Sequence, residues 1–296
     1  MGHCRCPALT PRHFRRPHHP QPGRSRHLRP LRRPRPRRRP HSRLRRNQRL
    51  LGSTRRRTRQ VLHVIVPDLR GIGRSSRPVG GYDKKNQAAD IRAVVTALGY
   101  DRASVVSHDI GIMVAYAYAA IYPDKVERLV IMDAPIPGIA PWDDIIKDHR
   151  LWHFSFWGPD EDRLAAGRER IYLDRIWDDF SGDPRQPDEA TRAFYAAQYA
   201  QPGAMHAGFE HFKAFAQDAT DNQAFARTKL TMPVLAVGGE KSIGATEAVI
   251  MRNVATNVRE AVVPGSGHWL MEENPIYTVA LIRDFLKDPS AATPTP

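Results

Sequence analysis

Short apolar runs alternate with helical patterns from residue 61 onward, and this alternation constrains the fold more than any other feature of the chain. Each run is five to seven residues long and rich in Val, Ile or Leu, which is typical of buried strands. The predicted strands are 61–66, 103–107, 128–133, 232–238 and 258–263, and the predicted helices are 84–98, 110–122, 245–253 and 275–287. Strands that alternate with helices in this way form parallel sheets. The sequence therefore predicts an α/β fold with a mostly parallel sheet.

One segment, residues 141–225, interrupts the alternation. Its composition is helical, and it holds four of the five tryptophans of the chain, Trp142, Trp152, Trp157 and Trp177. We expect a helical insertion here, between two parts of a core that comprise 61–140 and 226–288. The last residues, 289–296, are rich in Pro, Ala and Thr and are expected to be disordered.

Residues 1–60 differ in composition from the rest of the chain. They hold 21 Arg and no Lys, Asp or Glu, whereas the other 236 residues hold 25 basic and 31 acidic side chains. The net charge of +15 therefore combines an extremely basic leader with a mildly acidic body. Frequent prolines and few apolar side chains predict that the leader is disordered. A GC-rich coding sequence read in the wrong frame has the same composition, so a frame or start-site error is an alternative origin.

The composition also bears on partners and compartment. An arginine-rich arm can bind phosphates, but the leader has neither interleaved aromatic residues nor a recognised module, so nucleic acid is only the lesser alternative. No stretch is long and apolar enough to span a bilayer, and we expect no membrane association. Cys4 and Cys6, the only cysteines, lie in the leader. The body therefore has neither disulfides nor a cysteine-ligated metal, which predicts a reducing, cytoplasmic location.

Residues 107–111, SHDIG, lie where a predicted strand runs into a predicted helix. A turn of the form small-x-nucleophile-x-small strains its middle residue and exposes that side chain at the N-terminus of the helix. The middle residue here is Asp109. A carboxylate needs no base to act as a nucleophile at neutral pH, and it suits attack on an sp³ carbon to give an alkyl ester on the enzyme. Taken alone, the motif is explained more simply by a turn in which Asp109 caps the helix.

Three further residues could complete a hydrolytic site. His268 lies in a glycine-rich loop between the last predicted strand and the last predicted helix, where a neutral imidazole could activate water. An acid is needed to orient that imidazole. Asp133 ends the strand 128–133 at the carboxyl edge of the sheet, and Glu240, after the strand 232–238, is the alternative acid.

Together and in this order, the motifs resemble the α/β-hydrolase superfamily, in its epoxide hydrolase and haloalkane dehalogenase branch. Three segments carry the similarity, which covers roughly residues 61–287: PDLRGIGRSSRP at 67–78, HD at 108–109 and GHWLMEENP at 267–275. The resemblance implies a hydrolase core under a helical cap, with Asp109 as nucleophile, His268 and Asp133 as base and acid, and the backbone N–H of Ile110 in the oxyanion hole. It implies a small-molecule substrate, no cofactor and no metal, and a homodimer is compatible with it.

Departures from the family pattern affect the expected site and substrate. Ser242 stands where many relatives carry the acid, which favours Asp133 over Glu240. Ile110 and Met113 stand where fluoroacetate dehalogenases carry arginines. A small haloacid is therefore not expected, because no guanidinium would pair with its carboxylate.

The insertion is expected to contribute substrate contacts. Epoxide hydrolases use two cap tyrosines as donors to the epoxide oxygen, and this chain has His153 and Phe212 at those places. Phe212 has no donor, and three tyrosines could substitute for it: Tyr172, Tyr195 or Tyr199. Trp152 is a further candidate contact, although packing between helices explains most of these aromatic residues more simply.

The upstream part of the family pattern is missing. An HGxP loop that supplies the second N–H of the oxyanion hole should lie about 30 residues before PDLRG, yet residues 1–60 contain no HG pair. The first three strands of the family fold cannot be recognised there either. We therefore expect an epoxide hydrolase-like enzyme, with a hydrolytic dehalogenase as the alternative activity and an inactive, truncated relative as the alternative outcome.

Overall fold

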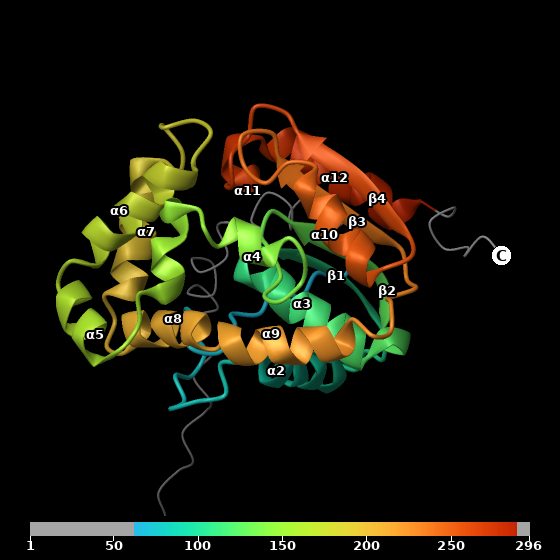
Figure 1. The fold of residues 1–296 in the computed structure, drawn as a ribbon, viewed down its shortest axis with the longest axis horizontal. Coiled ribbons are helices and arrows are strands. Elements are labelled where there is room, and N and C mark those ends of the chain that lie inside the picture. Colours follow the sequence, from blue (N-terminus) through green and yellow to red (C-terminus); the bar gives the residue numbers. More distant parts are fainter. Residues whose placement is uncertain (1–61, 289–296) are drawn as a thin grey trace, which may run out of the picture. The chain divides into compact units, whose positions relative to one another are not determined.

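The computed structural model describes residues 62–288, which contain a four-stranded parallel sheet (Figure 1). The strands follow one another in sequence order: β1 (Ala103–His108), β2 (Val126–Met132), β3 (Val234–Gly239) and β4 (Val258–Val263). Each neighbouring pair is parallel, and each connection contains at least one helix. The predicted α/β fold and four of the five predicted strands are thus confirmed. Predictions made for residues 1–60 and 289–296 lie outside the described residues.

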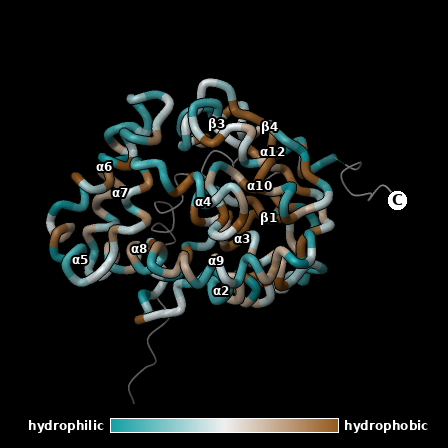
Figure 2. The backbone as a smooth tube through the Cα atoms, viewed as in Figure 1, coloured by the Kyte–Doolittle hydropathy of each residue, from teal (hydrophilic) through white to brown (hydrophobic). Residues whose placement is uncertain are grey.

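Helices cover both faces of the sheet. α3 (Ile110–Ile121) and α10 (Thr246–Val254) pack on one face, with α2 (Lys84–Ala97) against α3, while α11 (Leu270–Glu273) and α12 (Pro275–Lys287) pack on the other; a short turn, η1 (Pro123–Lys125), precedes β2. Side chains alternate along β2, so that Leu129 and Ile131 join the α3 side whereas Val130 and Met132 join the α12 side. Figure 2 shows the apolar residues concentrated along the strands and α3.

The predicted strand at 61–66 is wrong. Residues 62–66 have no regular secondary structure, although Val64, Ile65 and Val66 are partly buried. A strand requires backbone hydrogen bonds to a neighbouring strand, and within residues 62–288 β1 pairs with β2 alone. The edge of β1 that faces away from β2 therefore has no strand beside it in the described part of the chain.

The segment 141–225 folds into short helices: α4 (Trp142–Ile145), η2 (His149–Ser155), α5 (Pro159–Ala165), α6 (Glu169–Phe180), α7 (Glu189–Tyr199), α8 (Ala204–Lys213) and α9 (Phe215–Phe225). α9 packs against α2 and α3, whereas α5, α6 and α7 lie together at the left of Figure 1, away from the strands. The residues that follow β1, β2 and β3 face the helices of this segment across a cavity.

A buried ion pair joins α2 to α9. Both side chains of the pair, Lys84 and Asp218, are 1% exposed. Lys84 donates from Nζ to Asp218 Oδ2 and to the carbonyl of His211, each at 2.8 Å, and its backbone N–H donates to Asp218 Oδ1 at 2.8 Å. The ammonium also lies 4.8 Å from the centroid of the Phe215 ring. This contact fixes the last helices of the 141–225 segment to the core.

Candidate active site

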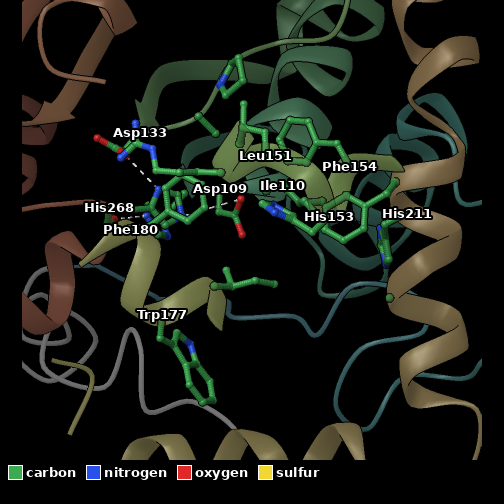
Figure 3. A pocket seen from close by; sticks show the side chains of 18 of the residues that line it. Asp109, Ile110, Asp133, Leu151, His153, Phe154, Trp177, Phe180, His211 and His268 are labelled. Carbon is green, nitrogen blue, oxygen red and sulfur yellow. Dashed lines mark hydrogen bonds and ion pairs between the residues drawn. The ribbon is translucent and has the colours of Figure 1, made fainter. Parts of the chain in front are cut away.

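A cavity of about 690 Å³ lies between the carboxyl ends of the strands and the helices of the 141–225 segment (Figure 3). Its walls come from the ends of β1 and β2, the loop after β3, and α6, α7 and α8. Most of the lining is aromatic or aliphatic, and polar groups gather at one side, where Asp109, Asp133 and His268 meet. A largely apolar cavity with a few convergent polar groups is typical of a small-molecule site.

Asp109 stands at the sharp turn from β1 into α3. Its φ of 53° lies in the left-handed region, which residues other than glycine adopt only when their surroundings hold them there. Its N–H donates to the Met132 carbonyl at 3.2 Å, and its own carbonyl accepts from the Ile112 N–H at 2.8 Å. The side chain makes no helix-capping hydrogen bond, is 49% exposed and lines the cavity. Asp109 therefore occupies the N-cap position of α3 without capping the helix through its side chain, and the turn exposes the carboxylate to the cavity.

Asp133 and His268 form a hydrogen-bonded pair beside Asp109. His268 donates from Nδ1 to Oδ1 of Asp133 at 2.9 Å, because a carboxylate can only accept. The other ring nitrogen, Nε2, lies 3.8 Å from Oδ1 of Asp109. The imidazole therefore lies between two carboxylates, with Nε2 on the side of Asp109 (Figure 3).

The carboxylate of Asp133 is buried and accepts from two further donors. The Ser242 hydroxyl donates to Oδ1 at 2.6 Å, and the Gly239 backbone N–H donates to Oδ2 at 2.5 Å. Ser242 stands where many relatives carry the acid. In this chain its hydroxyl instead binds Asp133, which follows the neighbouring strand β2. The side chain of Asp133 is thus held by three donors, including His268.

Hydrogen bonds and charge set the protonation of this pair. Burial by itself would raise the pKa of Asp133, but the hydrogen bonds from His268, Ser242 and Gly239 outweigh it and hold the pKa below its ordinary value. Burial by itself would lower the pKa of His268, but the hydrogen bond to Asp133 and the charge of Asp109 raise it above its ordinary value. An anionic Asp133 thus stands beside an imidazole that accepts a proton readily, as a general base must.

Of three other residues named from the sequence, Glu240, Ile110 and Met113, only Ile110 lines the cavity. Glu240 does not contact His268: its exposed carboxylate accepts from the Gly265 N–H at 2.7 Å, near the start of the histidine loop (residues 264–269). Ile110 lines the cavity and begins α3, so its backbone N–H has no acceptor within the helix. Met113 is buried in the core on α3 and does not line the cavity.

His108 belongs to the site, although the sequence pattern did not single it out. Its Nε2 donates to the His268 carbonyl at 2.7 Å, and the two rings lie 4.5 Å apart between centroids. Burial and the charge of His268 lower its pKa to about 4, so the ring is neutral at pH 7. Its place before Asp109 was the one available signal, because its partner lies 160 residues away in sequence.

Five of the predicted contacts from the helical segment line the cavity: His153, Tyr172, Tyr195, Tyr199 and Phe212. Trp152 does not, and its selection was wrong, because its ring packs edge-on against Phe156 and Tyr172 inside the segment. Phe212 stacks on Phe154, with 5.7 Å between the ring centroids, and contributes an apolar wall.

Two of these side chains can donate a hydrogen bond near Asp109. His153 is 6% exposed, burial lowers its pKa to about 4, and its Nδ1 has no hydrogen-bond partner among residues 62–288. Burial and the charge of Asp109 raise the pKa of Tyr199 to about 12, which keeps its hydroxyl protonated. Burial likewise raises the pKa of Tyr172, and its hydroxyl also has no partner in the described part of the chain.

His211 also lines the cavity, but both of its ring nitrogens are engaged. Nε2 donates to the Arg70 carbonyl at 3.1 Å, which leaves Nδ1 to accept from Gln87 Nε2 at 3.2 Å. Burial and the charge of Lys84 lower its pKa to about 3. This histidine therefore connects the PDLRG segment to α8 and is not available as a donor to a ligand.

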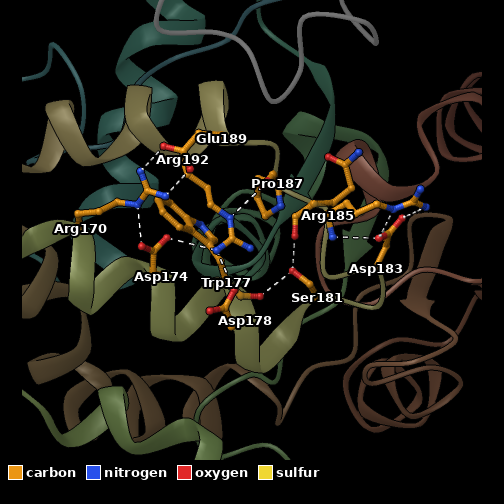
Figure 4. A network of polar contacts seen from close by, with 11 residues as sticks. Arg170, Asp174, Trp177, Asp178, Ser181, Asp183, Arg185, Pro187, Glu189 and Arg192 are labelled. Carbon is orange, nitrogen blue, oxygen red and sulfur yellow. Dashed lines mark hydrogen bonds and ion pairs between the residues drawn. The ribbon is translucent and has the colours of Figure 1, made fainter.

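A network of charged side chains supports the wall formed by α6 (Figure 4). Arg192 of α7 donates to Asp178 at 2.7 Å, to Asp174 at 3.2 Å and to the Pro187 carbonyl at 2.9 Å. Its guanidinium carbon lies 5.5 Å from the centroid of the Trp177 ring, and Trp177 lines the cavity. The network therefore supports Trp177 from outside the cavity.

No group of three or more His, Cys, Asp or Glu side chains in residues 62–288 is arranged to hold a metal ion. No helix of that range is both long and apolar enough to cross a membrane.

Comparison with known proteins identifies the family of the chain. Residues 54–275 match the family described as alpha/beta hydrolase fold. The soluble epoxide hydrolase of Corynebacterium sp. (strain C12) is 35% identical over 224 residues, which cover 73% of this chain and 78% of that protein. The fluoroacetate dehalogenase of Burkholderia sp. is 27% identical over 244 residues, which cover 76% of this chain and 78% of that enzyme.

Two solved structures have a similar fold. The epoxide hydrolase CorEH without ligand has a TM-score of 0.68 and 33% identity, and the similarity covers 74% of this chain and 80% of CorEH. Wild-type Cfl2 from Burkholderia cenocepacia has a TM-score of 0.70 and 31% identity, covering 79% of this chain and 83% of Cfl2.

Proposed function

The chain belongs to the alpha/beta hydrolase fold family, in its epoxide hydrolase-like branch, and we propose that it hydrolyses epoxides through a covalent ester on Asp109. One observation carries the proposal: Nε2 of His268 lies 3.8 Å from the Asp109 carboxylate while Asp133 binds the opposite side of the ring. This arrangement supports a nucleophile and a base that act in succession at the same place.

In the first step, a carboxylate oxygen of Asp109 attacks an epoxide carbon. A carbon–oxygen bond forms to Asp109, the bond from that carbon to the epoxide oxygen breaks, and the epoxide oxygen takes up a proton. The protonated Tyr199 hydroxyl is the proposed proton donor, and the neutral His153 ring is a proposed hydrogen-bond donor to the same oxygen, since both line the cavity and both lie within electrostatic reach of Asp109. The product of this step is a hydroxyalkyl ester on the enzyme.

In the second step, water attacks the ester carbonyl carbon and gives its proton to Nε2 of His268. Asp133 stabilises the imidazolium that forms. The negative charge on the carbonyl oxygen falls close to the start of α3, where the Ile110 N–H can donate to it. Collapse of this intermediate breaks the bond to the diol oxygen, which takes the proton from His268 as the diol leaves. The Asp109 carboxyl then loses its proton through solvent to the Tyr199 phenolate, so that all three groups are restored.

The lining of the cavity favours an uncharged, apolar substrate. Arg150 is the one Lys or Arg among the described lining residues, and Asp148 binds its guanidinium at 2.6 and 3.0 Å. A carboxylate on the substrate would therefore lack a free cation, which argues against a haloacid despite the similarity to a fluoroacetate dehalogenase. We propose that residues 141–225 act as a cap, whose aromatic side chains hold the apolar part of an epoxide over Asp109.

A single turnover in ¹⁸O-labelled water tests the covalent route. With enzyme in excess over epoxide, the label is expected in the peptide that contains Asp109 and not in the diol, because the diol takes its new oxygen from the carboxylate. Mass spectrometry of the digested protein and of the product measures both. Label that enters the diol directly in the first turnover would show that water attacks the epoxide without an ester.

The pH dependence of kcat follows from the raised pKa of His268. The imidazole must be neutral to accept a proton from water, so kcat falls as the pH drops through that pKa. Since the pKa is raised, the acid limb of the profile is expected above the ordinary histidine value of 6.5. Asp133→Asn removes the hydrogen bond to an anion that raises it, so the limb should move to lower pH while the plateau falls. An unchanged limb in the variant would exclude His268 as the titrating base.

A further inference from the structure

We propose that Glu273 is a positioning residue that fixes His268 by joining the histidine loop to the end of α6; this rests on the proposed role of His268 as the base. The Glu273 carboxylate accepts from four backbone N–H groups. Oε2 accepts from Gly182 at 2.8 Å, Asp183 at 2.9 Å and Gly267 at 2.9 Å, and Oε1 accepts from Trp269 at 3.2 Å. Two of these donors follow α6, and the other two flank His268.

Other contacts join the same two segments. The His268 N–H donates to the Phe180 carbonyl at 2.9 Å. Lys241, in the loop after β3, bridges the two segments: its Nζ donates to the Gly182 carbonyl at 2.9 Å, and its backbone N–H donates to the Ser266 carbonyl at 2.8 Å. The backbones also touch: a Cβ at Gly182 would lie 2.3 Å from the Gly267 nitrogen, and a Cβ at Gly267 would lie 2.2 Å from the Gly182 nitrogen. The histidine loop and the end of α6 therefore form one backbone junction, and Glu273 is bonded to both of its sides.

The junction depends on a charged acceptor. Four donors converge on one carboxylate, and hydrogen bonds to a charged acceptor are about twice as strong as neutral ones. Glutamine would keep a single acceptor oxygen and replace the other with an NH₂ group, which cannot accept. Alanine would leave all four N–H groups, including that of the buried Gly267, without this partner.

The backbone hydrogen bonds that hold Asp109 lie outside this junction, and the one link to it is the side chain of His108, which donates to the His268 carbonyl. Asp109 is fixed by backbone hydrogen bonds to Met132 and Ile112, and neither residue contacts Glu273 through a hydrogen bond. A change at Glu273 should therefore displace His268 and spare Asp109. In the proposed reaction this slows hydrolysis of the ester more than its formation.

The experiment measures the two steps separately in Glu273→Ala and Glu273→Gln. After mixing with excess styrene oxide, intact-protein mass spectrometry should show the ester accumulating in both variants. Steady-state kcat should fall, by about 100-fold in the alanine variant, because a shift of about 1 Å in a catalytic group costs this much. KM should fall with kcat, since only the second step is slowed. Glu260→Ala removes an exposed carboxylate paired with Arg252 and should behave as the wild type.

His268→Gln separates this inference from the proposed function. If His268→Gln accumulates no ester, the proposed function fails whatever Glu273 does. Two results would show that Glu273 is not a positioning residue for His268. In the first, His268→Gln accumulates ester while the Glu273 variants do not. In the second, the Glu273 variants lose ester formation and ester hydrolysis equally. Should alanine unfold the protein, the glutamine variant carries the same test.

Discussion

Asp109→Ala is expected to lower kcat/KM for epoxide hydrolysis by about 10⁴-fold or more, because it removes the atom that forms the ester. The loss should appear in ester formation itself, so no covalent adduct should be seen by intact-protein mass spectrometry. The backbone hydrogen bonds of position 109 to Met132 and Ile112 do not involve the side chain, so the variant should keep the conformation of the turn. The fold should therefore survive, as circular dichroism can check.

Two variants control for this result. Asp124→Ala removes an exposed carboxylate from η1 and should leave activity unchanged. Asp109→Asn keeps the shape of the side chain and should also abolish turnover, although slow deamidation could restore activity together with a mass increase of about 1 Da. If Asp109→Ala kept activity within about 10-fold of the wild type, the covalent route would be excluded.

Lys84→Met is expected to destabilise the fold by about 3–5 kcal/mol, since it leaves the Asp218 carboxylate buried without its cation. Asp218 is held by two hydrogen bonds from Lys84, one from the ammonium and one from the backbone N–H, and the substitution removes the first. Urea-induced unfolding of both proteins measures the difference in unfolding free energy. The effect should reach the active site, because the same ammonium donates to the carbonyl of His211 in the cavity wall.

The matched control is Arg163→Met, which breaks an ion pair with Asp160 in which both side chains are largely exposed. Such pairs contribute little to stability, so no measurable change is expected. The double variant Lys84→Met/Asp218→Leu should recover part of the loss, because it leaves no buried charge unpaired. A Lys84→Met protein as stable as the wild type would show that the pair is not needed to hold α9 on α2.

Local sequence patterns predicted the elements and the turn that presents Asp109. β2 and β3 are largely buried apolar runs, β1 is partly buried, and β4 carries the exposed Arg259 and Glu260 among its apolar residues. The strand character of all four is visible in a few residues. The run at 61–66 has the same pattern and fails, because strand formation also needs a neighbour and the pattern does not report one. The arrangement of Asp133, His268 and Ser242 was partly predictable, since all three lie at the carboxyl edge of a parallel sheet.

Contacts between distant segments were not predictable from the sequence. His108 and Glu273 lie in recognised motifs, but the motifs do not show that both side chains bind the backbone of the histidine loop. His153 and Trp152 are neighbours with similar aromatic surroundings, yet the turn of η2 directs one into the cavity and the other into the packing of the helical segment. A rotation of this short helix by one residue would exchange the two side chains, and hydrophobic periodicity does not determine the rotation of so short a helix.

The network behind Trp177 has a consequence for redesign of substrate range. Charged contacts on α6 and α7 hold the wall from outside the cavity, so a smaller residue at position 177 should enlarge the binding space and not collapse it. Libraries that vary this wall can therefore change which face of an epoxide is presented, and hence the enantiomer of the diol, while the hydrolytic groups on the sheet stay in place.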